Sequence, residues 1–239
     1  YDNKQTSQWT SNSIRTDWTL ILERIHSTRK RGLRVLDIGC NTGELLALVP
    51  DYFKKYGVEV NKAAAEVAAA RGITVYHHIE AIPAAAQFDT IILSDVIEHV
   101  TDPASFLTYL SGLLSTEGEI LITTGDFENH LWRKFGASWW YCSFLEHISF
   151  ISESWAAKLC ESGALRVDGV ARFRYIELNR IRFIADLILM TMYGIFPRAY
   201  QKIGETLKSI FGKNGDVFVR GFGISRDHIF LSLKLARNE

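Results

Sequence analysis

An acidic pair followed by a histidine, Asp95-x-x-Glu98-His99, is the segment of this sequence best suited to chemistry. If the segment is helical, spacings of three and four residues place all three side chains on one face. Two carboxylates and an imidazole could bind a divalent cation such as Mg²⁺. A neutral imidazole, with an ordinary pKa of about 6.5, could instead act as a general base toward a hydroxyl group or position a substrate. Packing or helix capping is a third interpretation.

A glycine turn stands earlier in the chain. A short apolar run from Leu33 to Ile38 leads into a turn that contains Gly39 and Gly43, and the turn passes into residues 44–48. We interpret this as strand, turn and helix, in which glycines let the backbone approach a ligand and the helix start offers unpaired N–H groups. Three residues separate the two glycines, whereas a dinucleotide loop has the pattern GxGxxG. A nicotinamide dehydrogenase is therefore disfavoured.

Glu59 is the second residue that points to a nucleoside ligand. It stands 20 residues beyond Gly39, in the predicted strand 56–60. In nucleoside-binding α/β folds an acidic residue at this place accepts hydrogen bonds from ribose hydroxyls. A solvated carboxylate at a strand end is the alternative.

The elements that must position these residues alternate between strands and helices. Alternation of this kind predicts parallel βαβ units with right-handed crossovers. Apolar runs predict seven strands, at 33–38, 56–60, 73–76, 88–93, 119–123, 165–175 and 228–235, and helical patterns cover 14–28, 44–48, 62–70, 104–114 and 153–162.

Taken together, these segments resemble the class I S-adenosylmethionine-dependent methyltransferases, and most of all the branch of the ubiquinone-biosynthesis O-methyltransferases. The resemblance covers about residues 34–164 and rests on DIGCNTG at 37–43, on Glu59, and on the segments 88–100 and 118–124. It implies an α/β fold: a Rossmann-like, doubly wound, seven-stranded sheet, mostly parallel with an antiparallel last strand and with helices on both faces. A helical insertion would precede the last strand.

The resemblance also implies one methyltransferase domain over residues 1–239. Within it we expect an N-terminal cap helix in 1–32, a cofactor-binding half in 33–125, and an acceptor half in 126–239 whose helical insertion covers about 178–224.

S-adenosylmethionine is the cofactor that the resemblance implies. Asp37, Gly39 and Gly43 would shape its methionine and ribose end, Glu59 would hold the ribose, and the residues after the third strand would cover the adenine. His78 stands where the family usually has Asp, which favours a backbone contact there. The full predicted set of cofactor residues is Asp37, Gly39, Cys40, Asn41, Gly43, Glu59, Val60, His78, Ile79, Ser94 and Asp95.

The catalytic residues that we expect are Asp95, His99 and His147. Ser94 and Asp95 would face the sulfonium, and the family often has a histidine at the place of His147. Similar acidic-x-x-Glu-His segments bind Mg²⁺ in some of these enzymes, which would make Asp95, Glu98 and His99 the ligands. Other relatives with this motif are not known to use a metal, so the prediction names no metal and keeps Mg²⁺ as an alternative.

Charge and composition limit the partners. The 27 basic and 27 acidic residues give a formal net charge of zero, so we expect no nucleic-acid partner. The charges are uneven, because residues 166–239 contain 13 basic and 7 acidic residues. This excess has two interpretations, a solvated surface or a contact with an anionic or amphiphilic molecule. We expect O-methylation of a small-molecule, sugar or lipid-linked metabolite. A non-catalytic cofactor-binding subunit that docks a partner is the alternative.

An apolar segment from Leu178 to Phe196 departs from the βαβ pattern. Its residues 181–196 would span about 24 Å as a helix, short of the ~30 Å hydrocarbon core, and they include two charges, so we exclude a transmembrane span. A lid, a homodimer interface or a peripheral membrane contact stays open.

The three cysteines form no CxxC pair, and residues 1–17 contain no apolar signal-peptide core. Both observations favour a cytoplasmic protein, with peripheral membrane association as an option.

Overall fold

A mixed sheet of seven strands forms the centre of the computed structural model, which describes residues 15–28, 30–136, 139–143, 146–161, 163–174, 184, 188, 191–192, 195–196 and 226–236. The strands are β1 Arg34–Ile38, β2 Lys54–Val58, β3 Thr74–Tyr76, β4 Phe88–Ser94, β5 Leu114–Gly125, β6 Leu165–Phe173 and β7 His228–Leu235. The helices are α1 Thr16–Ser27, α2 Glu44–Leu48, α3 Lys62–Ala70, α4 Pro103–Ser111, α5 His130–Phe135 and α6 Glu153–Cys160, with short 3₁₀ turns η2 Ile79–Ala81, η3 Ile97–His99 and η5 Trp140–Ser143.

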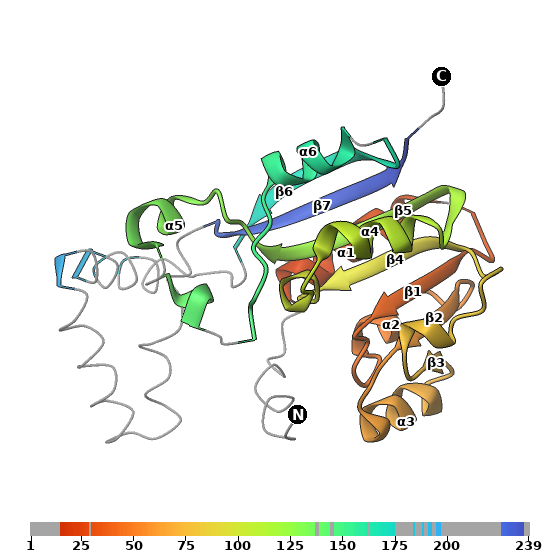
Figure 1. The fold of residues 1–239 in the computed structure, drawn as a ribbon. Coiled ribbons are helices and arrows are strands. Elements are labelled where there is room, and N and C mark those ends of the chain that lie inside the picture. The colour runs from red at the N-terminus through yellow and green to blue at the C-terminus, as the bar shows by residue number, and fades with distance from the viewer. Residues whose placement is uncertain are drawn as a thin grey trace, which may run out of the picture.

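The strand order is β3-β2-β1-β4-β5-β7-β6. Pairs among β1 to β5 are parallel, whereas β7 runs antiparallel to both β5 and β6, as its arrow in Figure 1 shows. The predicted seven-stranded Rossmann-like sheet with an antiparallel last strand is therefore confirmed. The order reverses direction between β1 and β4, which is where open α/β sheets bind ligands.

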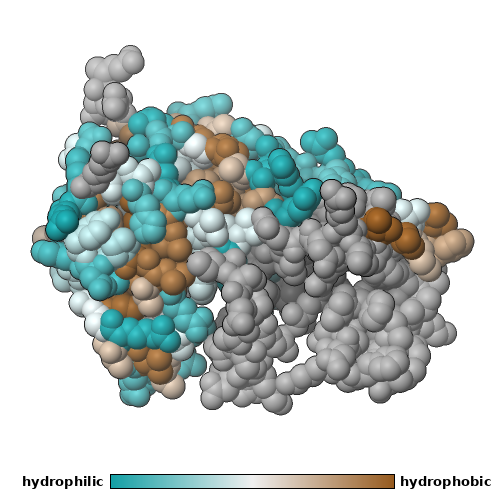
Figure 2. Space-filling view, turned by 180° about the vertical axis from the view of Figure 1, so that it is seen from behind, coloured by the Kyte–Doolittle hydropathy of each residue, from teal (hydrophilic) through white to brown (hydrophobic). Residues whose placement is uncertain are grey.

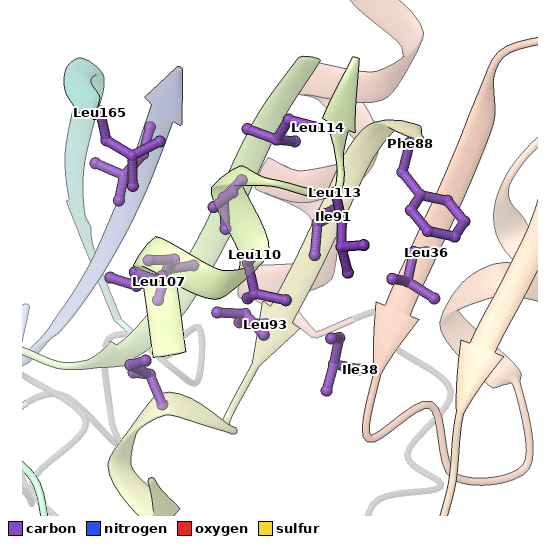
Figure 3. Packing of buried hydrophobic residues seen from close by; sticks show 14 of the residues in the cluster. Leu36, Ile38, Phe88, Ile91, Leu93, Leu107, Leu110, Leu113, Leu114 and Leu165 are labelled. Carbon is purple, nitrogen blue, oxygen red and sulfur yellow. The ribbon is translucent and has the colours of Figure 1, made fainter. Parts of the chain in front are cut away.

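Helices cover both faces of the sheet, as predicted. Alternate residues of the central strands point to opposite faces. On one face Leu93 of β4 packs in a cluster with Leu107 and Leu110 of α4 (Figure 3). On the other face Ile92 of β4 packs in a cluster with residues of α1, α2 and α3, including Ile21. Helices therefore pack against both faces of the sheet. Ligands of open α/β sheets bind at the carboxyl ends of the strands.

The bounds of several strands differ from the prediction, most of all those of β5 and β2. Strand β5 begins at Leu114 and runs through Gly118, which was expected to lie before the strand. A Cβ atom on Gly118 would lie 2.8 Å from the carbonyl oxygen of Phe88, so glycine here permits close pairing of β5 with β4. Strand β2 ends at Val58, and Glu59 consequently lies just beyond the strand.

Some predictions fall outside the described residues. Most of the helical insertion at 178–224 and of the apolar segment 178–196 belongs to this part, as does the N-terminal stretch 1–14. In the described part of the chain, no helix is long and apolar enough to cross a membrane. The division of residues 1–239 into a cap helix and two halves stays a prediction.

A network of charges ties α1 to the edge of the sheet. Arg24 of α1 donates to Glu119 of β5 at 2.8 Å and to Asp168 of β6. Asp168 also pairs with Arg166 at 2.9 Å and with Lys234 of β7 at 3.1 Å. Partial burial favours the neutral acid, but hydrogen bonds from Lys234, Arg24 and Arg166 outweigh this effect and lower the pKa of Asp168 to about 2.

Replacing Asp168 with asparagine is expected to lower the free energy of unfolding by about 1 kcal/mol at neutral pH, as for other partly exposed ion pairs. Because the folded pKa lies below the ordinary value of 3.8, this stabilisation is present above that value and is lost as the pH falls toward 2. The free energies of unfolding of the parent protein and of the variant, measured by urea titration, should therefore converge as the pH falls through this range. Asp51→Asn is the control, since Asp51 is fully exposed and pairs with Lys55. A difference that stays constant down to the lowest pH would contradict the assignment.

Candidate S-adenosylmethionine site

The predicted cofactor residues meet at the carboxyl ends of three neighbouring strands. The turn after β1 contains Gly39 to Gly43, Glu59 follows β2, and Ser94 ends β4. Strand β1 pairs with β2 on one side and with β4 on the other, so these three strand ends lie side by side. The structure therefore brings together residues that are 55 positions apart in the sequence, from Gly39 to Ser94.

The turn after β1 has the backbone that its glycines predict. Gly39 and Gly43 have φ of 73° and 77°, and Asn41 also lies in the left-handed region at 48°. The N–H groups of Gly39 and Cys40 donate to the carbonyl oxygen of Val58, at 2.9 and 3.1 Å, which fastens the turn to β2. A left-handed conformation costs little for glycine and about 1–2 kcal/mol for other residues, so two of these positions call for glycine.

Gly43 is expected to be the more sensitive glycine. A Cβ atom there would lie 2.3 Å from Cδ1 of Ile73 and 3.2 Å from Cβ of Ala68. Ile73 is buried, so its methyl group has little room to move. Gly43→Ala should therefore lower the free energy of unfolding by about 2 kcal/mol or more, from strain and overlap together.

Gly72→Ala is the matched control for Gly43→Ala. Gly72 has a similar φ of 82°, but no atom lies within 4 Å of the position of its Cβ. The control therefore carries the backbone strain without the overlap. Urea denaturation of both variants measures their free energies of unfolding. Equal losses of this free energy would show that the overlap with Ile73 adds no cost.

Glu59 joins two turns. Its Oε2 accepts the N–H of Asn41 at 2.9 Å, and its Oε1 accepts the N–H of Asn61 at 2.7 Å. A carboxylate oxygen can accept two hydrogen bonds, so each oxygen keeps acceptor capacity for a further donor. The two oxygens suit the paired hydroxyls of a ribose. Val60, also predicted for this site, is 63% exposed next to Glu59.

Asp37 provides the test of whether a cationic ligand fits. The residue is only 4% exposed, and burial raises the pKa of its carboxyl group to about 8, against the effect of the Arg15 charge. In the described part of the chain, no group donates a hydrogen bond to this carboxylate. A buried acid without a donor is costly, and an ammonium group supplied by a ligand would relieve it. The amino-acid end of S-adenosylmethionine carries such a group, so the residues fit the cofactor.

Two site residues at the start of α1 were not predicted, Asp17 of the helix and the preceding residue Arg15. Arg15 donates to Asp17 at 2.6 Å and to Asp95 at 2.5 Å, and the hydroxyl of Ser94 donates to Asp17 at 2.9 Å. Asp17 is fully buried, which raises its pKa, while the Arg15 charge opposes the shift. The start of α1 thus closes this end of the site. The sequence contained a signal for Asp17, because this residue lies on the apolar face of the helix, four residues before Ile21.

Asp95 does not share a helical face with Glu98 and His99, and this part of the interpretation is wrong. Asp95 has φ of 53°, and helical structure begins only at η3. The left-handed residue turns the chain, so Asp95 meets Arg15 while Glu98 is 1% exposed. The assumption of a continuous helix failed because the chain leaves β4 through this turn.

Glu98 is buried at the expected acceptor end of the site, where its carboxylate accepts two hydrogen bonds. Its Oε1 accepts the hydroxyl of Tyr141 at 2.7 Å and its Oε2 that of Thr124 at 3.0 Å. Burial raises the pKa of Glu98 to about 7, and the Asp95 charge adds to the shift, although the two hydrogen bonds oppose it. The carbonyl oxygen of Glu98 accepts the N–H groups of Ile148 and Ser149, which fixes the chain next to His147.

His99 and His147 lie together, with ring centroids 5.0 Å apart. Nδ1 of His99 lies 3.0 Å from the carbonyl oxygen of Glu146, and Nδ1 of His147 lies 2.9 Å from that of Tyr141. A carbonyl oxygen only accepts, so each Nδ1 carries a proton, and Nε2 is then the nitrogen of each ring that can accept one. Burial lowers the pKa of His147, which favours its neutral form.

The potential metal ligands differ from the predicted set. One ligand atom each from Glu98, His99 and His147 lie within 4.8 Å of one another, whereas the predicted ligand Asp95 pairs with Arg15. Two imidazoles and one carboxylate suit zinc or manganese better than Mg²⁺, which prefers oxygen ligands. These residues therefore do not fit Mg²⁺.

A cluster of aromatic side chains lies near His99 and His147, next to Tyr141. Phe127 and Trp132 have ring centroids 4.1 Å apart, and Phe150 lies 5.6 Å from Phe127. All three are half-buried, whereas Trp139 is buried against Tyr141. Of the residues predicted to cover adenine, His78 is exposed and Ile79 is half-buried at the start of η2.

Comparison with known proteins agrees with this geometry. Residues 12–164 match a family model described as a methyltransferase domain. The chain is 29% identical over 189 residues to a ubiquinone biosynthesis O-methyltransferase of Aromatoleum aromaticum, an alignment that covers 71% of this chain and 77% of the relative. It is 32% identical over 116 residues to the protein of the same name from Rhodopseudomonas palustris, and here it spans 43% of the relative's length and 44% of its own.

A solved structure extends the likeness to most of the fold. The crystal structure of coclaurine N-methyltransferase bound to N-methylheliamine and S-adenosylhomocysteine superposes with a TM-score of 0.60 at 15% identity, covering 91% of this chain and 72% of that one. At this identity the likeness concerns the fold.

Proposed function

The chain belongs to the class I S-adenosylmethionine-dependent methyltransferases, and on that premise we propose that it methylates a hydroxyl oxygen of a small-molecule, sugar or lipid-linked metabolite. The observation that carries this proposal is the pair of imidazoles, His99 and His147, which lie 5.0 Å apart with each Nδ1 held by a backbone carbonyl oxygen. An alcohol or phenol must lose its proton to become a good nucleophile, and an imidazole nitrogen is the usual acceptor. The names of the relatives point the same way.

The cofactor end of the site has three tasks in this proposal. S-adenosylmethionine supplies a methyl group on a sulfonium, which already carries its leaving group. Glu59 would bind the ribose hydroxyls, and Asp37 would pair with the ammonium group. The turn from Gly39 to Gly43 would let the backbone approach the ligand. Methyl transfer then depends mainly on alignment in a site that excludes water.

The acceptor end has the second set of tasks. Nε2 of His99 would take the proton of the hydroxyl group, since its Nδ1 is held by the carbonyl of Glu146. His147 would position the acceptor beside it, and the half-buried rings of Phe127, Trp132 and Phe150 would pack against its apolar part. Glu98 would act as a positioning residue through Tyr141 and the backbone of residues 148–149.

Two measurements test the proposed function in sequence. Isothermal titration with S-adenosylhomocysteine should show binding, and the enzyme incubated with S-adenosylmethionine and a panel of hydroxylated metabolites should yield a product heavier by one CH₂ group. Each acceptor is paired with its methoxy and its amino counterpart. A product from the amine alone would overturn O-methylation, and cofactor binding without any product would favour a non-catalytic subunit that docks a partner.

A further inference from the structure

Arg172 of β6, the last strand of the sheet, joins two segments of the acceptor side. Its Nε donates to Oδ2 of Asp126 at 2.7 Å, just after β5. Its Nη2 pairs with Oε2 of Glu153 at 3.0 Å, in the first turn of α6, and Oε2 of Glu128 lies 4.0 Å from the same nitrogen. Figure 1 shows α6 alongside β6, so the arginine reaches both segments from the strand.

The burial of Asp126 sets this ion pair apart from others on the surface. Hydrophilic side chains cover much of the molecule in the view of Figure 2, and ion pairs between exposed side chains contribute little to stability. The side chain of Asp126, however, is fully buried, whereas that of Arg172 is 40% exposed. A buried carboxylate that loses its cation keeps an uncompensated charge. Asp126 is therefore expected to move when Arg172 is removed.

Asp126 in turn fixes the backbone between β5 and α5. Its Oδ1 accepts the N–H of Glu128 at 2.9 Å, and its carbonyl oxygen accepts the N–H of Asn129 at 3.1 Å. Asn129 caps α5, because its side chain accepts the N–H of Trp132 at 2.9 Å. A displacement of Asp126 would consequently move both Phe127, which is the next residue, and Trp132.

The segment before α6 supplies the other side of the aromatic cluster. The ring of Phe150 lies 5.6 Å from that of Phe127, and Phe150 stands three residues before Glu153. The two segments also meet directly, since the N–H of Phe127 donates to the carbonyl oxygen of Ile151 at 3.0 Å. Arg172 thus holds together the segments that contain the two phenylalanines. We propose that Arg172 is a positioning residue for the acceptor and acts through the placement of the aromatic cluster.

This inference rests on the proposed function in one respect, the packing of the aromatic cluster against the acceptor. Strands β5 and β7 separate β6 from β4 and the cofactor residues, so a change at Arg172 should not alter the affinity for the cofactor. A displaced cluster would weaken the binding of the acceptor in the ground state and in the transition state alike. Loss of such binding raises KM and leaves kcat nearly unchanged.

Kinetics of Arg172→Gln test the proposal, with the hydroxylated metabolite that the parent protein methylates. We expect KM for this acceptor to rise about tenfold or more, because the loss of an apolar contact in a pocket weakens binding by about this factor. The change in kcat should be small, and the affinity for S-adenosylhomocysteine should equal that of the parent. An unchanged KM would overturn the proposal.

Arg166→Gln is the matched control. Arg166 lies on the same strand, its side chain is 39% exposed, and it pairs with Asp168 at 2.9 Å, so its replacement should leave KM unchanged. An equal rise of KM in this control would also overturn the proposal. Arg172→Lys keeps a positive charge beside Asp126 but lacks the planar fork that makes both contacts. Its KM should lie between those of the parent and of Arg172→Gln, and it carries the test if circular dichroism shows Arg172→Gln to be unfolded.

A fluorescence measurement without any acceptor separates a failure of this inference from a failure of the proposed function. Acrylamide quenches exposed tryptophans, and the difference between each protein and its Trp132→Phe form isolates Trp132. Arg172→Gln should raise the quenching constant of Trp132 about twofold or more, since local opening exposes side chains, whereas Arg166→Gln should not. Equal quenching in Arg172→Gln and the parent would overturn the inference. Increased quenching without methylation of any acceptor would sink the proposed function but support the placement of the cluster by Arg172.

Discussion

Replacing Glu59 with alanine is expected to weaken the binding of S-adenosylhomocysteine by about 100-fold or more, with the fold intact. Hydrogen bonds to a charged group contribute about 1.5–3 kcal/mol each, and the variant removes an acceptor for two ribose hydroxyls. It also releases the N–H groups of Asn41 and Asn61, which the carboxylate now holds at 2.9 and 2.7 Å. The turn after β1 would lose part of its ordered shape as well. Isothermal titration of both proteins measures the effect.

Two further variants make the result for Glu59 specific. Glu66→Ala removes an exposed carboxylate of α3 and should leave the affinity unchanged. Glu59→Gln keeps the shape and one carbonyl oxygen, so its loss should lie between those of the parent and of Glu59→Ala. Circular dichroism checks that each variant is folded. An affinity for S-adenosylhomocysteine that survives Glu59→Ala would remove the ribose role from this residue.

The cofactor half could be predicted from the sequence because local rules determine it. The short apolar run before Gly39, the two glycines, and the spacing of 20 residues to Glu59 each reflect a requirement of one turn or one strand end. The structure places them at adjacent strand ends, with positive φ at both glycines. Sequence periodicity predicts such features well, since they depend on neighbours in the chain.

The entry of α1 into the site could not be predicted in the same way. Its contacts join Arg15 and Asp17 to Ser94 and Asp95, which are about 80 residues away in the sequence. Nothing in the local pattern states which strand end a terminal helix will reach. The position of Asp17 on the apolar face of α1 indicated only that its carboxylate would need a polar partner once it is buried.

The acceptor side shows a third case, in which residue types were identified but their grouping was not. Asp95, Glu98 and His99 were expected to act together, yet one left-handed residue separates Asp95 from the other two. His147 takes its place beside Glu98 and His99. A positive φ at a non-glycine residue has a weak sequence signal, because aspartate tolerates this conformation without requiring it.

Replacing His99 with alanine is expected to lower kcat by about 100-fold or more while the affinity for S-adenosylhomocysteine stays unchanged. General bases contribute about 10²–10⁴-fold to rates, and Nε2 of His99 is the basic nitrogen that the carbonyl of Glu146 leaves available. Added imidazole should restore part of the turnover of this variant, because a diffusing base can fill the space. A merely structural histidine would show no such rescue. The measurement is turnover of an accepted hydroxyl substrate with and without imidazole.

Controls for His99→Ala separate proton transfer from metal binding and from general loss of histidine. His26→Ala changes an exposed histidine of α1 and should keep full turnover. A chelator added to the parent enzyme should leave turnover intact if His99 acts as a base. If instead the chelator abolishes turnover and imidazole fails to rescue His99→Ala, then Glu98, His99 and His147 act as metal ligands. In that case His99 and His147 bind a cation together with Glu98, and a group other than His99 accepts the proton of the acceptor hydroxyl.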